Sequence, residues 1–136
     1  MQITILKNRL TTEGFTALYT AVGWTPPCLE QISAALENSL AIFTAVADGS
    51  VVGMARLTGD GAMTFLLKDV AVTPEAQGAG VGRLLVSAAE EFVRSSLKSG
   101  WAASLELLGT TGKEGFYEKL GFRSDCGTGM LKMIRR

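Results

Sequence analysis

A glycine-rich segment in the middle of the chain is the part of the sequence best suited to bind a ligand. It reads DVAVTPEAQGAGVGRLL over residues 69–85, so an apolar run passes through a short turn into the glycine-rich start of a helical pattern. The first turn of a helix has backbone N–H groups without intrahelical partners, and together with the helix dipole they favour an anion. Glycines let a bulky group approach that backbone closely. The segment therefore predicts a site for a polyphosphate cofactor.

Two common nucleotide-binding patterns do not fit this segment. A dinucleotide site needs G-x-G-x-x-G and an acidic residue about 20 residues later, whereas the glycines here are Gly78, Gly80 and Gly82. A P-loop needs a lysine and a hydroxyl residue after its last glycine, whereas Arg83 and Leu84 follow Gly82. Both nucleotide patterns are therefore excluded.

The residue types present limit the possible catalytic groups. The chain contains no histidine, which removes every Ser–His or Cys–His nucleophilic pair. Cys28 and Cys126 lie far apart without a CxxC pattern, so neither a disulfide framework nor a Cys/His zinc site is indicated. We expect no metal site, and a base that is a carboxylate, a tyrosine, a lysine or water.

The composition indicates a folded domain that binds neither nucleic acid nor a membrane. Of the 136 residues, 47% are hydrophobic and 19% are charged, so a single globular domain over residues 1–136 is expected. The net charge of zero removes the basic footprint of a nucleic-acid binder. Charges interrupt every apolar stretch, and Lys7 and Arg9 follow MQITIL directly, so neither a membrane span nor a signal peptide is indicated. We therefore expect a cytoplasmic protein.

The hydrophobic periodicity predicts an α/β fold around the glycine-rich segment. Alternation and short apolar runs predict strands, and apolar residues at i, i+3, i+4 and i+7 predict helices. The predicted strands are 3–5, 41–47, 51–57, 63–72 and 104–108, with final strands from Phe122 onward that include 129–134. The predicted helices are 15–22, 26–36, 80–100 and 111–121. Strands 63–72 and 104–108 should be parallel neighbours because a helix joins them.

Local signals predict several boundaries. Thr25 stands before two prolines and is the expected N-cap of the second helix. The turn 48–50, with sequence Asp-Gly-Ser, should join two strands into a hairpin. Thr111 and Glu114 have the spacing of a capping box at the start of the short helix. The apolar second half of strand 63–72 should lie centrally in the sheet.

Two motifs together resemble the signatures of the GNAT N-acetyltransferase superfamily. The first is Gln or Arg, two residues, Gly, one residue, then Gly or Ala, and it follows V-x-V-x-P. It is met by Val70, Val72, Pro74, Gln77, Gly80 and Gly82. The second is GFYEKLGF at 115–122, which resembles the superfamily's C-terminal motif. The resemblance implies a central mixed, mostly antiparallel sheet with helices on both faces, and acetyl-CoA as the acetyl donor.

The resemblance also implies which residues hold acetyl-CoA. Val70, Ala71 and Val72 should offer backbone groups to the pantetheine arm. The pyrophosphate is assigned to the loop and helix start that follow, namely Gln77, Gly78, Ala79, Gly80, Val81, Gly82 and Arg83. A solvated Arg83 is the alternative for that side chain. Thr110 stands where the superfamily often has asparagine, and its hydroxyl can bond the pantetheine or water but cannot act as a base.

Tyr117 is the residue to which the resemblance assigns acid catalysis. An amine that attacks the thioester gives a tetrahedral intermediate, and the thiolate leaves more readily when it is protonated. A tyrosine hydroxyl, with a reference pKa of about 10, can protonate a thiolate of pKa about 8.5 if the local field brings the two values closer. The alternative is a tyrosine packed at the edge of the core.

The base that deprotonates the amine is less clearly marked. Some members of the superfamily have a glutamate on the strand just before the cofactor contact, but Lys68 occupies that position here. The candidates are Asp60, in the turn before that strand, and Asp69, on the strand itself, with Glu106 as a third choice. Each aspartate has a structural alternative, because Asp60 can shape its turn and Asp69 can pair with a cation.

The stretch 53–72 further resembles the plant-plastid and cyanobacterial arylalkylamine (serotonin-type) N-acetyltransferases. The matching residues are Gly53 to Arg56, Asp60, Asp69 and Val70. We therefore expect an acetyl-CoA-dependent N-acetyltransferase that acts on the primary amine of a small molecule, with arylalkylamines as one candidate class. The alternatives are acetylation of a protein or peptide amine, and a non-catalytic module that binds acetyl-CoA. The resemblance also makes a homodimer an expectation.

Overall fold

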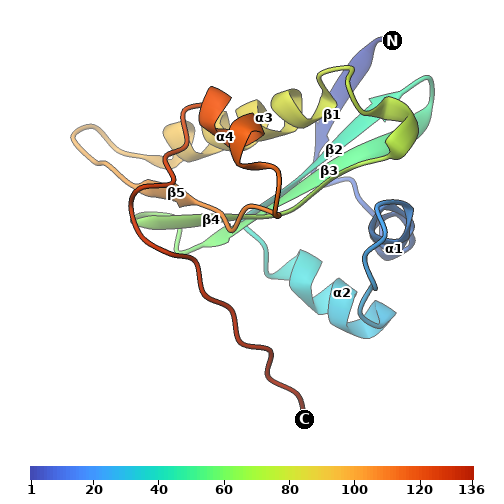
Figure 1. The fold of residues 1–136 in the computed structure, drawn as a ribbon, viewed down its shortest axis with the longest axis horizontal. Helices are drawn as coiled ribbons and strands as arrows, with labels where there is room; N and C mark the ends of the chain where they lie inside the picture. The colour runs from blue at the N-terminus through green and yellow to red at the C-terminus, as the bar shows by residue number, and fades with distance from the viewer. The chain divides into compact units, whose positions relative to one another are not determined.

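The computed structural model describes residues 1–136 and divides into two units, Met1–Glu106 and Leu107–Arg136. A five-stranded sheet lies at the centre of the first unit (Figure 1). The strands, which lie in sequence order across the sheet, are β1 (Ile3–Lys7), β2 (Ala41–Ala47), β3 (Ser50–Gly59), β4 (Thr64–Val72) and β5 (Ser104–Glu106). The first four pair antiparallel, and β5 pairs parallel to β4. The expected mixed, mostly antiparallel sheet is confirmed, whereas the extent of the domain, 1–136, stays a prediction.

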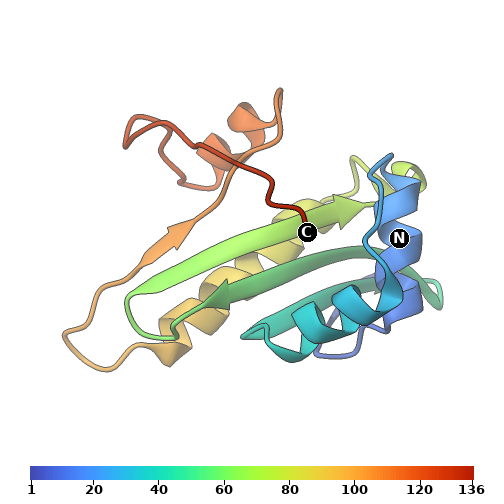
Figure 2. The same cartoon turned by 90° about the horizontal axis from the view of Figure 1, so that it is seen from below.

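Helices cover both faces of this sheet, as expected (Figure 2). On one face α3 (Val81–Ser96) packs against the first four strands, and its buried side chains are Val81, Leu85, Val86, Ala89 and Val93. On the other face lie α1 (Thr12–Ala21) and α2 (Leu29–Glu37). There an apolar cluster joins the two helices to the sheet, and its buried members are Phe15, Leu18, Ile32, Met54 and Ala71. None of the helices combines the length and apolar composition that a membrane span needs.

The predicted hairpin is confirmed, but the predicted limits of the helices differ from those in the structure, most clearly for the second helix and the long helix. Asp48 (φ 51°) and Gly49 (φ 77°) form the turn between β2 and β3, in the left-handed conformations that suit a two-residue hairpin turn. The second helix begins at Leu29 rather than after Thr25, because a residue that precedes proline is displaced from helical dihedral angles. The long helix ends at Ser96, four residues before the predicted stop at Gly100, since the backbone at the following residue is already extended.

The second unit contains one short helix, α4 (Glu114–Lys119), and a turn at Gly112 precedes it. The expected capping box is wrong, because Lys113 is the N-cap residue and no side chain caps the helix. Gly112 has a φ of 89° and turns the chain between Thr111 and the helix. The Glu114 carboxylate accepts a hydrogen bond from the Gly112 N–H instead.

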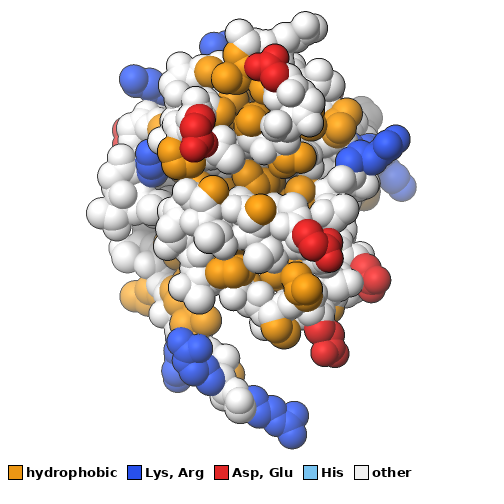
Figure 3. Space-filling view, turned by 90° about the vertical axis from the view of Figure 1, so that its right-hand side faces the viewer, with side chains coloured by type: hydrophobic (Ala, Val, Ile, Leu, Met, Phe, Trp, Pro, Cys, Tyr) orange, Lys and Arg blue, Asp and Glu red, His pale blue; other side chains and the backbone are white.

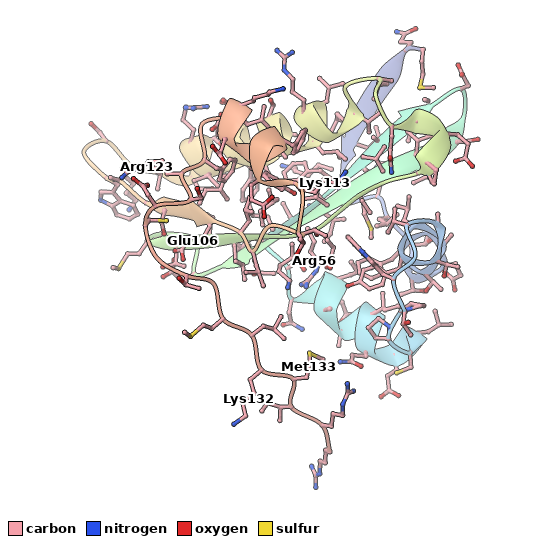
Figure 4. The ribbon with its side chains drawn as sticks, in the orientation of Figure 1. Arg56, Glu106, Lys113, Arg123, Lys132 and Met133 are labelled. Carbon is pink, nitrogen blue, oxygen red and sulfur yellow. The ribbon has the colours of Figure 1, made fainter.

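The final strands predicted after Phe122 are also wrong. No helix or strand follows α4, and four apolar side chains of the last segment are exposed: Met130, Leu131, Met133 and Ile134. An alternating pattern forms a strand only when a neighbouring strand and a packed face stabilise it. Figure 4 labels Lys132 and Met133 on this extended segment, and Figure 3 shows Lys and Arg side chains in blue near its end.

The turn between β3 and β4 is built around the side chain of Asp60. Its Oδ1 accepts hydrogen bonds from the backbone N–H groups of Ala62, Met63 and Thr64 at 2.9, 2.8 and 3.0 Å. These hydrogen bonds stabilise the charged carboxylate and lower the pKa of Asp60 below its ordinary value. The structure therefore gives Asp60 the turn-forming role that the sequence left open.

We expect Asp60→Asn to destabilise the first unit at neutral pH and to have less effect in acid. Because the pKa of Asp60 is lower in the folded state than its ordinary value of 3.8, the charged carboxylate stabilises the fold above that pH. This contribution is lost as the pH falls through the folded-state pKa. Urea unfolding of both proteins between about pH 2 and about pH 7 measures the difference in free energy of unfolding. A difference that does not shrink below pH 3.8 would contradict the assignment.

Gly53 of β3 lies where the start of α3 packs onto the sheet. A Cβ atom there would stand 3.0 Å from the carbonyl oxygen of Ala71, 3.0 Å from Val81 Cγ1 and 3.1 Å from Leu85 Cδ1. These separations are tighter than ordinary van der Waals contacts, and one of the three atoms belongs to the backbone. The missing side chain therefore lets the first turn of α3 rest directly on β3 beside the end of β4.

We expect Gly53→Ala to lower the free energy of unfolding by about 1–3 kcal/mol, because the added methyl group overpacks this contact. Gly115→Ala on α4 is the matched control, since nothing lies within 4 Å of a Cβ atom at that position. Urea unfolding curves of the two variants and the wild type provide the comparison. Equal stability of Gly53→Ala and the wild type would show that α3 does not depend on this close approach.

Candidate functional site

The second half of β4 has an unpaired backbone edge. β5 pairs with β4 only through Thr64–Leu66, so the remainder of β4 has a strand partner on its β3 side alone. Backbone N–H and C=O groups along such an edge can pair with an extended ligand. Val70, Ala71 and Val72 lie at the end of this edge. The prediction that the second half of this strand lies centrally in the sheet is therefore wrong, because that half has a neighbouring strand on its β3 side alone.

A β-bulge at Asp69 immediately precedes these three residues. Met54 of β3 pairs with Ala71, and Arg56 pairs with Lys68, so two steps along β3 match three steps along β4. The extra residue disturbs the ladder, and Asp69 takes a left-handed φ of 54°. A bulge reverses the alternation of the strand beyond it, because side chains otherwise point to opposite faces at each step. The bulge therefore sets how residues 70–72 face the open edge.

The loop after β4 leads directly to the start of α3. The side-chain amide of Gln77 donates a hydrogen bond to the carbonyl oxygen of Val72 at 3.0 Å, which ties the loop to the end of the strand. Gly78 and Gly80 have φ of 84° and 85°, where an L side chain would be strained, and nothing lies within 4 Å of a Cβ atom at either position. The loop thus presents an exposed backbone that a bulky group can approach.

The N-terminus of α3 has the features of an anion site. Gly80 is its N-cap residue and supplies no side-chain cap, and the first turn contains no acidic residue. The first intrahelical hydrogen bond joins the Leu84 N–H to the Gly80 carbonyl at 3.1 Å, so the N–H groups of Val81, Gly82 and Arg83 precede the helical ladder. The side chain of Arg83 is exposed and forms no ion pair. These residues, with the open edge of β4, fit the pyrophosphate and the pantetheine arm of acetyl-CoA.

Asp69 is held by two side chains on the α1 and α2 side of the sheet. Its Oδ1 accepts a hydrogen bond from the Tyr19 hydroxyl at 2.8 Å, and its Oδ2 accepts one from Arg56 Nε at 2.7 Å. The side chain of Asp69 is 6% exposed and that of Arg56 is 18% exposed. The structure therefore realises the alternative in which Asp69 pairs with a cation. A carboxylate has about four acceptor sites, so the two hydrogen bonds formed here leave acceptor sites free.

The side chains around this pair connect α1, β3 and β4 with the loops that contain Trp24 and Ser39. Arg56, labelled in Figure 4 on the side of the sheet that faces α2, also approaches the Ser39 hydroxyl at 3.4 Å. The Tyr19 ring stacks on Phe15 with centroids 4.8 Å apart and meets Trp24 edge-on at 5.0 Å. Burial and the neighbouring carboxylate raise the pKa of the Tyr19 hydroxyl. Tyr19 therefore remains a protonated donor to Asp69.

Tyr117 and Thr110 belong to the second unit. The Tyr117 ring meets Phe116 and Phe122 edge-on, with centroid separations of 4.9 and 5.8 Å. Burial raises the pKa of the Tyr117 hydroxyl, so this group stays protonated at neutral pH and has a proton to donate. The same shift makes Tyr117 a weaker acid and widens the gap to the pKa of a thiolate, which is opposite to the direction expected from the sequence. Thr110 is exposed, and its carbonyl oxygen accepts a hydrogen bond from the Lys113 N–H at 2.9 Å.

The first unit brings together most of the residues expected at the site, but not all of the candidate bases. Asp69, the three residues after it, and the loop from Gln77 to Arg83 are contiguous at one end of β4. Asp60 precedes the other end, and five steps along the strand, roughly 17 Å, separate Thr64 from Asp69. Glu106 is exposed on β5, where its carboxylate accepts a hydrogen bond from the Ser104 hydroxyl. No group of three His, Cys, Asp or Glu side chains could hold a metal ion.

Sequence reasoning did not connect Tyr19 and Arg56 to Asp69. Tyr19 falls within the apolar periodicity of the predicted helix 15–22, and Arg56 falls within the stretch 53–72. The available signal is the presence of Arg56 and Asp69 within largely apolar strands. Because a buried charge is costly unless it is paired, two opposite charges of this kind indicate a contact.

Comparison with known proteins agrees with this geometry. Residues 38–124 match a family model described as an acetyltransferase (GNAT) domain. A GNAT family acetyltransferase structure from Streptococcus pneumoniae is 34% identical, with a TM-score of 0.78, and the match covers 99% of this chain and 100% of that one. A chloroplastic serotonin N-acetyltransferase from Oryza sativa is 30% identical over 112 residues, which are 79% of this chain and 54% of the rice protein.

A histone acetyltransferase from Glycine max is 32% identical over 120 residues, which cover 80% of this chain and 50% of the soybean protein. The chain thus spans about half the length of the curated relatives it matches. The relatives carry different substrates in their names, but both are acetyltransferases. With a family model that covers more than half of its residues and a solved structure that matches it end to end, the chain belongs to the GNAT acetyltransferase family.

Proposed function

We propose that this chain transfers the acetyl group of acetyl-CoA to the primary amine of a small molecule. The observation that carries the proposal is the open edge of β4 next to the uncapped start of α3. An extended arm with amide groups suits the strand edge, and a pyrophosphate suits the glycine-rich helix start. Acetyl-CoA combines both chemical features in one molecule.

The chemistry requires two proton movements. The amine nitrogen attacks the thioester carbon, the carbon–sulfur bond breaks, and the thiolate takes a proton while the nitrogen loses one. We assign the first proton to the Tyr117 hydroxyl, which burial keeps in its neutral form. We assign the second to a water molecule linked to Asp69, because that carboxylate already accepts bonds from Tyr19 and Arg56 and retains free acceptor sites.

Arylalkylamines are the first acceptor class to test. The similarity to a serotonin N-acetyltransferase from rice supports this class, whereas the similarity to a histone acetyltransferase from soybean supports a protein amine as the second candidate. A regulatory module that binds acetyl-CoA without turnover is the third. A cytoplasmic location and a homodimer remain predictions from the sequence.

We expect Tyr117→Phe to lower kcat about 100-fold and to leave the Kd for acetyl-CoA unchanged, since the loss concerns proton transfer alone. Release of free CoA thiol should be followed with aromatic, aliphatic and polyamine acceptors and with lysine peptides. Because burial raises the pKa of Tyr117, wild-type kcat should show no loss from tyrosine ionisation up to about pH 10.

The outcomes of this assay distinguish the three candidate functions. Turnover of arylalkylamines that depends on Tyr117 supports the proposal, and turnover of peptides alone favours the protein substrate. Binding of acetyl-CoA without turnover on any acceptor, indifferent to Tyr117→Phe, favours the regulatory module. Failure of the wild type to bind acetyl-CoA would overturn all three.

We expect Arg83→Glu to weaken acetyl-CoA binding about tenfold without loss of stability. The added negative charge opposes a phosphate at the start of α3, yet a glutamate in the first turn of a helix is stabilising. Arg83→Gln is the matched control, because it removes the guanidinium and adds no charge. Calorimetric binding and thermal unfolding measure the two effects. Wild-type affinity in Arg83→Glu would place the pyrophosphate elsewhere, and wild-type affinity in Arg83→Gln would identify Arg83 as a solvated side chain.

A further inference from the structure

We propose that Tyr19 is a positioning residue for the acetyl donor. Its hydroxyl holds Asp69, and through Asp69 it fixes the bulge that directs residues 70–72 toward the open edge of β4. The identity of the ligand at that edge rests on the proposed function. The positioning itself rests on the contacts among Tyr19, Arg56 and Asp69.

The conformation of Asp69 needs a restraint from outside the strand. A φ of 54° is uncommon for non-glycine residues, and although Asp adopts it more readily than most, that tolerance permits the bulge without fixing it. The strand before and after the bulge pairs regularly with β3, so nothing in the ladder itself requires the extra residue. The two hydrogen bonds to the Asp69 carboxylate, from Tyr19 at 2.8 Å and from Arg56 at 2.7 Å, supply the restraint.

The bulge decides which face of the sheet the side chains after Asp69 occupy. Leu67 pairs with Leu57 of β3, on the face where Phe43 of β2 meets Phe92 of α3. Ala71 instead belongs to the apolar cluster with Phe15 on the opposite face. Two residues four apart on a regular strand share a face. The bulge has therefore turned the side chains of residues 70–72 to the opposite face of the sheet, and it has changed which edge of β4 each of their backbone groups faces.

Tyr19 is itself held in place by its aromatic neighbours. Its ring is held between Phe15 and Trp24 on the side of the sheet away from α3. Its raised pKa keeps the hydroxyl protonated, so the donor to Asp69 does not ionise at neutral pH. Arg56 contributes the opposite charge, but its removal would leave a buried carboxylate without a counter-charge. Tyr19 is consequently the anchor that can be removed with the least disturbance.

The test is Tyr19→Phe, which retains the ring packing and removes only the hydroxyl. Thr44→Val is the matched control, because the Thr44 hydroxyl is buried without a hydrogen-bond partner and Thr44 pairs with Met54 in the same sheet. Two quantities are measured for each protein. One is the rate of amide hydrogen exchange along β2 and β4 without ligand, and the other is the Kd for acetyl-CoA.

We expect Tyr19→Phe to speed exchange at residues 69–72 about tenfold while exchange in β2 stays at the wild-type rate. We expect its Kd for acetyl-CoA to rise about three- to tenfold, because a less ordered edge must be fixed on binding. Thr44→Val should change neither quantity. Wild-type exchange at residues 69–72 in Tyr19→Phe would overturn the proposal.

Two further outcomes are informative. Exchange that rises equally in β2 and β4 would show that Tyr19 only stabilises the unit as a whole, which also overturns the proposal. If the wild type does not bind acetyl-CoA, the proposed function fails. The exchange rates at residues 69–72 then still decide whether Tyr19 positions this edge.

Discussion

The ladder between β4 and β5 ends after three residue pairs, and the site depends on where it ends. A parallel neighbour along the whole of β4 would satisfy the backbone groups of Val70 to Val72 within the sheet. Because the pairing stops at Leu66, those groups stay available at the end of the strand that leads into the glycine-rich loop. The strand edge and the helix start consequently form one continuous surface of backbone donors and acceptors.

Much of this arrangement could be predicted from local sequence. The glycines at 78, 80 and 82 indicated a tight turn with an exposed backbone, and Gly78 and Gly80 do adopt positive φ. The Asp-Gly pair at 48–49 specified a hairpin, and the apolar stripe of α1 placed Phe15 and Leu18 in the core. In these cases one short segment carries the whole physical signal, through backbone conformation or through periodicity.

Other features depend on contacts between distant residues and could not be predicted in the same way. The bulge at Asp69 involves partners 13 and 50 positions away, at Arg56 and Tyr19. The sequence does not show which apolar strand residues could line an acceptor pocket, and three of the bulkiest, Met54, Phe43 and Phe65, are buried in the core. The pattern at 129–134 resembles a strand, but without a paired neighbour its alternation does not produce one. Asp60 is a different case, because its three backbone partners lie only two to four residues away and the turn-forming role was one of the two alternatives that the sequence offered.

The close approach at Gly53 has a consequence for the choice of donor. It packs the first turn of α3 against β3 and the end of β4 with no side chain between them, so the two binding surfaces cannot shift independently. Under the proposed function the donor must span the distance between these two surfaces, because its diphosphate binds at the start of α3 and its arm binds at the edge of β4. The length of the arm that joins the diphosphate to the thioester then contributes to the choice of donor, alongside the acyl group.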